Sequence, residues 1–184
     1  RGHHQANVYQ QCHNGQTAMH FAIASTSRSA AVAVSRLHLI TGGTETREAF
    51  TGYTLLHRAA MEGSAAVFRD VLRRTANVDA KDRLGRTALF FAAWTKHDPA
   101  LRVKLLLARG ANVDVVDTAT GDTPLLYFLR ECCVWLGKTT QCAIVSCFLD
   151  HGADRTARAA RVPAGTKNEW GEDAGSAEGI FIAA

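Results

Sequence analysis

A similar eight-residue pattern occurs four times in this chain, and each copy begins with a glycine. The copies start at Gly15, Gly52, Gly85 and Gly121, with spacings of 37, 33 and 36 residues. A period in that range is typical of stacked supersecondary units, which bury their faces only against their neighbours. The sequence therefore predicts a solenoid rather than a closed globule.

The second copy predicts a pair of helices most clearly. A first helix is expected to begin at Thr54 and end near Met61, because Gly63 interrupts the pattern. Ser64 is suited to cap a second helix by accepting a backbone N–H. The apolar stripe of that second helix comprises Val67, Phe68, Val71 and Leu72.

The third copy predicts the same helix pair from different residues. Asp98 followed by Pro99 indicates an N-cap with a proline in the first turn. Gly110 is suited to the left-handed conformation that ends the helix. Small residues on the first helices should let neighbouring helices approach closely; they are Ala22, Ala59, Ala60, Ala92 and Ala93.

These motifs resemble those of the ankyrin-repeat family. Thr54-Leu55-Leu56-His57 with Ala59-Ala60 matches the family pattern, as do the helix exits Leu106–Asp114 and Leu149–Asp154. The resemblance covers about Cys12 to Asp154. It implies an all-α, ankyrin-type solenoid of stacked helix-turn-helix repeats with short hairpin or loop fingers. The first helices and the fingers would line the concave side, and the second helices the convex side.

The repeat pattern also predicts how the chain divides. Repeats one and four are stretched, near Ser25–Ala31 and Cys132–Gln141 respectively. A degenerate cap could use Ala174, Ala177, Ile180 and Phe181, with a tail as the alternative. The expected segments are an N-terminal extension or preceding repeat end at 1–11, repeats at 12–43, 44–79, 80–114 and 115–154, and a loop with a degenerate capping repeat or tail at 155–184.

The histidine of the repeat motif is present in only two copies, as His20 and His57, and is replaced by Phe90 and Leu126 in the others. In the family this histidine helps to tie a loop by hydrogen bonds. The resemblance therefore implies that repeats three and four depend more on packing.

The sequence contains no catalytic motif: no phosphate-binding glycine loop, no Gly-x-Ser-x-Gly and no His-Glu-x-x-His. Cys132, Cys133, Cys142 and Cys147 include no Cys-x-x-Cys pair, so core packing is favoured over a metal site. The motif explains His20 and His57 structurally, which disfavours Cys–His nucleophilic catalysis. We expect a protein that is not an enzyme and has no cofactor or metal.

Charge and hydropathy indicate the kind of partner. The net charge is +4, and Asp70, Asp79 and Asp82 interrupt the basic residues of repeats two and three, which favours a solvated helix face over nucleic-acid binding. No apolar run is long enough to span a bilayer.

The odd cysteine count indicates reduced thiols, so we expect the protein to lie in the cytoplasm, with the nucleus as the alternative. Lacking an initiator Met and a signal-peptide pattern, the chain is expected to be part of a longer protein.

The resemblance assigns partner binding to finger tips and to the exposed ends of the first helices. The repeat fold does not require large apolar side chains at these positions. We therefore expect them to face solvent and to anchor an interface. The alternative is that stretched neighbouring loops cover Phe50 and Trp94. The predicted partner-binding residues are Phe50, Tyr53, Met61, Glu62, Arg83, Leu84, Arg86, Trp94, Thr95, Asp122, Arg130 and Glu131.

The predicted function is non-catalytic protein–protein interaction, as a scaffold, adaptor or targeting module. Arg83 and Arg86 predict a partner protein with acidic segments. Two alternatives are a substrate-recognition or regulatory domain of a larger enzyme, and a self-associating structural unit. A homo-oligomer is not expected.

Overall fold

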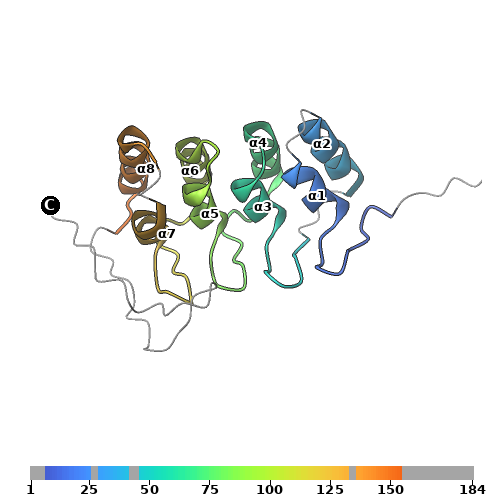
Figure 1. Ribbon diagram of the computed structural model, residues 1–184, viewed down its shortest axis with the longest axis horizontal. Helices are drawn as coiled ribbons and strands as arrows, with labels where there is room; N and C mark the ends of the chain where they lie inside the picture. The colour runs from blue at the N-terminus through green and yellow to red at the C-terminus, as the bar shows by residue number, and fades with distance from the viewer. Residues whose placement is uncertain (1–6, 26–28, 42–45, 133–135, 155–184) are drawn as a thin grey trace, which may run out of the picture.

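The computed structural model describes residues 7–25, 29–41, 46–132 and 136–154. The described residues form eight α-helices and one π-helix, and no strand. The helices pair along the chain and the pairs stack side by side (Figure 1). Helices α1 (Ala18–Ala24), α3 (Leu55–Met61), α5 (Ala88–Trp94) and α7 (Pro124–Tyr127) form one row, next to the finger loops. Helices α2 (Ala30–Thr41), α4 (Ala65–Arg74), α6 (Pro99–Ala108) and α8 (Lys138–Asp150) form the outer row. The predicted all-α solenoid is confirmed.

The repeated glycine and threonine determine where each inner helix begins. Gly15, Gly52, Gly85 and Gly121 all have positive φ, between 73° and 77°. A Cβ on Gly15 would lie 2.5 Å from the backbone N of Ala49, so a side chain there would also collide with the next finger. Two residues after each glycine, a threonine in extended backbone forms the N-cap.

The outer helices follow the predicted pattern with one exception. The Ser64 hydroxyl accepts the Val67 N–H at 3.3 Å, and the predicted stripe of α4 is buried. Gly110 ends α6 with φ 81°, as predicted. Asp98 does precede α6, but its backbone is left-handed, with φ 48°, and its side chain forms no capping hydrogen bond. Asp98 therefore occupies the predicted cap position, followed by the predicted proline in the first turn.

The core of the stack lies between helix pairs, where small side chains allow close packing. Ala59 and Ala60 of α3 and Ala92 and Ala93 of α5 are completely buried, and α3 packs on α5. Larger side chains such as Phe68 and Leu106 fill the space towards the outer row. The predicted role of the small residues in these two helices is confirmed.

The fourth repeat departs from the others already before the expected extra residues, which begin at Cys132. Helix α7 is only four residues long and continues directly into the π-helix η1 (Phe128–Cys132). Outer helix α8 is thirteen residues long. The π-helix shares only Cys132 with the predicted extension, of which residues 133–135 lie outside the described residues. The proposed cap at 155–184 and part of the stretched segment of repeat one lie outside the described residues.

Arg102 of α6 is 1% exposed, although nothing in the sequence pattern set it apart. Its guanidinium donates to Ala59 O at 2.5 Å and to His97 O at 2.6 Å, and also to Gly63 O. It lies 5.2 Å from the ring centre of Phe68. Burial lowers the pKa of Arg102 to about 10. The side chain therefore satisfies carbonyls at the end of α3 and joins repeats two and three.

Replacing Arg102 with methionine should lower the free energy of unfolding by about 3 kcal/mol, because buried carbonyls lose their donors. Urea denaturation of the purified chain measures this change. Arg69→Met, on the exposed side of α4, is the control and should change stability by less than about 0.5 kcal/mol. Equal unfolding midpoints for the two variants would show that Arg102 does not hold the junction.

Candidate protein-interaction surface

Each finger is a loop closed by a backbone hydrogen bond just before an inner helix. Glu48 N donates to Tyr53 O, Asp82 N to Arg86 O and Asp117 N to Asp122 O, each at 2.9 Å. In the first finger, Cys12 N donates to Gln16 O at 2.8 Å. The fingers therefore fall into two loop sizes, since the closing bond spans four residues in the first and third fingers and five in the second and fourth.

Neighbouring fingers are joined to one another near their tips. Ala49 N donates to Asn14 O at 3.2 Å, Arg83 N to Thr51 O at 3.0 Å, and Thr118 N to Leu84 O at 2.8 Å. Each junction has one such backbone bond, so the tips form a continuous edge along the stack. Side chains at these tips keep a fixed spacing, which a binding surface requires.

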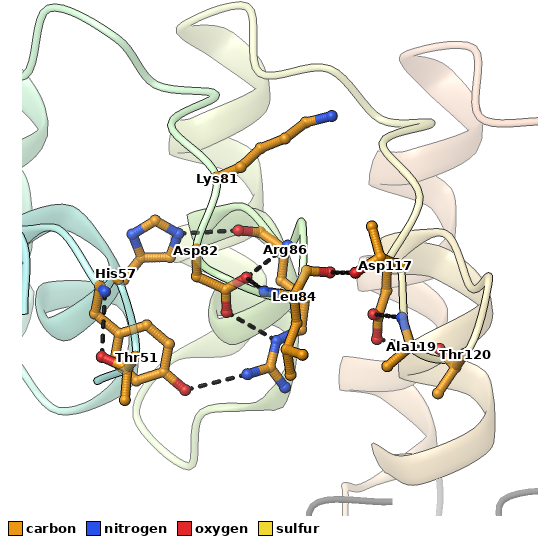
Figure 2. Close-up of polar contacts among 12 residues, drawn as sticks. Thr51, His57, Lys81, Asp82, Leu84, Arg86, Asp117, Ala119 and Thr120 are labelled. Atoms are coloured by element: carbon orange, nitrogen blue, oxygen red, sulfur yellow. Dashed lines mark hydrogen bonds and ion pairs between the residues drawn. The ribbon is translucent and has the colours of Figure 1, made fainter. Parts of the chain in front are cut away.

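His57 ties the third finger to the second repeat, as the resemblance implied (Figure 2). Its Nε2 lies 3.1 Å from Arg86 O, and its Nδ1 lies 3.1 Å from Thr54 N. Because Nε2 must donate to a carbonyl and Nδ1 must accept an N–H, the ring is neutral. Burial lowers the pKa of His57, in agreement with this pattern.

Four predicted partner-binding residues are buried, so the expectation that they face solvent is wrong. Tyr53 is 9% exposed, and its ring packs against His57 and Phe91. Its hydroxyl accepts from Nη2 of Arg86 at 3.2 Å, while Nε of Arg86 donates to Asp82 at 3.0 Å (Figure 2). These side chains hold the finger to the inner helices, which is a folding role.

Thr95 and Asp122 are the other two buried residues of that set. The Thr95 hydroxyl donates to Met61 O at 2.9 Å, which joins the ends of α5 and α3. Asp122 lies 2.7 Å from Nη1 of Arg130, and burial raises the pKa of its carboxyl. The positions of these residues within the repeat predicted that they lie on the inner side of the stack. Those positions did not predict that neighbouring residues cover them.

The other predicted residues reach the surface to different extents. Met61 and Trp94 are half-buried and pack against the core. Leu84 and Arg130 are half-buried, and Glu62, Arg83 and Glu131 are exposed. Phe50 is 61% exposed, and no described loop covers it. The structure brings Phe50, Arg83 and Leu84 together on adjoining finger tips.

Two surface residues, Arg47 and Phe21, escaped the sequence analysis, whereas Lys81 follows from its position at a finger tip. Arg47 is exposed, and its Nη1 donates to Lys81 O at 2.6 Å, so Arg47 and Lys81 lie beside Arg83. Phe21 of α1 is 58% exposed on the inner row. Arg47 could have been found from its position in a finger, whereas the exposure of Phe21 depends on what packs beside α1.

Cysteine placement differs in part from the prediction of core packing. Cys142 is exposed and Cys147 is half-buried in α8, so Cys142 does not pack in the core. Among the described residues, no group of three or more His, Cys, Asp or Glu side chains is placed to hold a metal ion. No helix within the described ranges combines the length and hydropathy needed to span a membrane.

The fold is that of a repeat solenoid with fingers, and comparison with known proteins identifies the kind of repeat. The sequence model of the ankyrin repeat matches residues 51–83 and 84–118. The chain is also 32% identical over 120 residues to human B-cell lymphoma 3 protein, which covers 63% of this chain and 25% of that protein. The chain thus spans about a quarter of the length of this relative. Residues 51–118 therefore match two consecutive ankyrin repeats.

We predict that Tyr53→Ala lowers the free energy of unfolding by about 3 kcal/mol, because it removes a buried aromatic side chain. Phe50→Ala, three residues away on the same finger, should cost less than about 0.5 kcal/mol because the ring is exposed. Thermal and urea unfolding of both variants measure the difference. A similar large loss for Phe50→Ala would mean that the ring is part of the core.

We also predict that the protein loses stability as the pH falls below about 6.5. Burial lowers the pKa of His20, His38 and His57, so the unfolded chain binds protons that the folded chain does not. Unfolding midpoints between pH 7.5 and pH 5.5 should therefore decrease. His57→Gln should flatten this dependence, whereas His97→Gln, at an exposed position, should leave it unchanged. If His57→Gln leaves the dependence of the unfolding midpoint on pH unchanged, the conclusion that the His57 ring is buried and neutral is wrong.

Proposed function

We propose that this chain is a non-catalytic recognition module that binds a partner protein on its finger tips and inner helices. Ankyrin repeats are generally protein–protein interaction modules, and this chain contains matches to that repeat. The joined fingers support the proposal, since they present side chains from separate repeats at a fixed spacing.

The exposed ring of Phe50 is the observation that carries the proposal. It stands beside Arg83 and Leu84 of the next finger, and aromatic and arginine side chains are the usual anchors of protein interfaces. A buried polar network holds the fingers in place beneath it. The proposed partner-binding surface therefore comprises Phe50, Arg83 and Leu84, with Met61, Glu62, Trp94, Arg130 and Glu131 along the inner row.

The charge of this surface supports a partner segment with acidic residues. Arg86 does not contribute to the positive charge of this surface, because its ion pair with Asp82 neutralises it. Arg47, Lys81 and Arg83 take its place as the exposed cations. We propose an adaptor or targeting role in the cytoplasm or the nucleus, with no catalytic activity of its own.

Two variants test this proposal in an affinity pull-down from the source cell. Phe50→Ala and Arg83→Ala should each weaken capture of the same partner about thirtyfold, the size of a loss of about 2 kcal/mol. Val32→Ala and Arg69→Ala remove exposed side chains from the outer helices and should leave capture unchanged. Stronger losses for the outer-helix variants would move the binding surface to the convex side.

A further inference from the structure

Exposed cations recur at one level of the outer helices α2, α4 and α6. Arg36, Arg69 and Lys104 lie five, five and four residues before the last residue of their helices. All three side chains are exposed, and α4 packs against both α2 and α6 (Figure 1). The repeats therefore place one cation on each of three neighbouring helices, at nearly the same level.

Helix α4 adds a second cation to the same side of the stack. Arg69 and Arg73 are four residues apart, so they share one helix face, and both are exposed. The side chain of Arg73 is 71% exposed. The buried stripe of α4 faces the core instead. We name Arg36, Arg69, Arg73 and Lys104 the basic outer face.

The one carboxylate on these three helices does not neutralise the basic outer face. Asp70 accepts from Nη2 of Arg73 at 2.8 Å and from Nε of Arg74 at 3.2 Å. Two arginines therefore share a single negative charge, and the group keeps a net positive charge. In the part of the chain that the structure describes, no carboxylate pairs with Arg36, Arg69 or Lys104.

The other aspartates that interrupt the basic residues in the sequence are used elsewhere. Asp82 is buried and pairs with Arg86 in the third finger. Asp79 accepts the backbone N–H of Asn112 at 2.9 Å. Both aspartates follow the end of α4, so the alternation of charge along the sequence, which disfavoured nucleic-acid binding, is not repeated on the outer helices.

The outer helices present charge without the anchors that other kinds of interface use. Among the described residues of α2, α4 and α6, Val32 is the only large apolar side chain that is exposed, and the aromatic ring of Phe68 is buried. Protein interfaces depend on aromatic and apolar anchors, membrane-surface helices bury an apolar face, and single strands stack on aromatic rings. The basic outer face has none of these features.

A nucleic-acid duplex requires no such anchor, because lysine and arginine contacts to its phosphates suffice for binding without sequence preference. Neighbouring helices pack about 10 Å apart, so the row from Arg36 to Lys104 is about 20 Å long. Over that length a duplex carries about twelve phosphate charges on its two strands. Charge complementarity and the lack of anchors thus favour a duplex over other polyanions.

We propose that the basic outer face binds the phosphate backbone of double-stranded nucleic acid without reading its sequence. Arg36, Arg69 and Arg73 donate guanidinium N–H bonds to phosphate oxygens, and Lys104 contributes a point charge. The outer helices lie on the other side of the stack from the fingers (Figure 1). A bound duplex therefore leaves the finger tips open to the partner protein of the proposed function, on which this inference does not rest.

Fluorescence anisotropy of a short labelled DNA duplex, titrated with the full chain, tests this inference. The logarithm of the association constant should fall linearly with the logarithm of the NaCl concentration, with a slope of about −3.6 for four phosphate contacts. A second duplex of the same length and a different sequence should give the same slope, because only phosphates are contacted.

A matched pair of double variants locates the contact. Arg69→Gln with Lys104→Gln should make the slope shallower by about 1.8 and weaken binding at low salt about tenfold or more, because two phosphate contacts are lost. Arg47→Gln with Arg83→Gln removes the same charge from the finger tips and should leave the slope unchanged. Thermal unfolding followed by circular dichroism checks that both variants remain folded.

Three results would overturn the inference: a slope near zero for the unaltered chain, equal losses of slope in the two double variants, or tighter binding to phosphatidylserine vesicles or polyglutamate than to the duplex. The last result would assign the basic outer face to a membrane or to an acidic protein. None of these measurements involves the partner protein, so a failed pull-down with an intact duplex slope counts against the proposed function alone.

Discussion

Packing between neighbouring helix pairs is the constraint on which the rest of the structure depends, since no pair can bury both of its faces alone. The completely buried alanines of α3 and α5 allow the inner helices to lie close together. That closeness brings each finger within hydrogen-bonding distance of the next, as Arg83 N to Thr51 O shows. A substitution that separates two inner helices would therefore also break the continuous edge of finger tips, so the proposed binding surface depends on the core behind it.

The junctions between repeats are not equally supported by polar contacts. Between repeats two and three, His57, Thr95 and Arg102 all cross the junction. In repeat one, Nε2 of His20 is buried and has no hydrogen-bond partner in the described part of the chain. Repeat three has Phe90 at the histidine position, where it packs on Tyr127 and leaves the Thr87 hydroxyl without a partner among the described residues. Arg47, Lys81 and Arg83 thus lie on the best-supported junction, which favours a rigid surface there.

The sequence alone predicted features that depend on residues close together in the chain better than features that depend on contacts between repeats. Helix starts at Thr54 and Ser64, and the exit at Gly110, follow from short-range rules of capping and backbone conformation, and they were predicted. The site was predicted less well. Tyr53 and Arg86 were placed on the correct side of the stack, but their burial arises from contacts between repeats, which the register does not contain. Arg102 was missed because its acceptors are carbonyls of another repeat.

The same contacts explain why the exposed charges differ from those expected. Fingers two, three and four have an acidic residue at the equivalent positions Glu48, Asp82 and Asp117. Glu48 pairs with Arg58 of α3, and Asp82 pairs with Arg86, which lies just before α5. These ion pairs are shielded from solvent, so they stabilise the fingers and contribute little to long-range attraction of a partner. The field in front of fingers two and three then comes from Arg47, Lys81 and Arg83, which neutral carbonyls position. The exposed positive charge of this edge is therefore a consequence of how the framework uses its carboxylates.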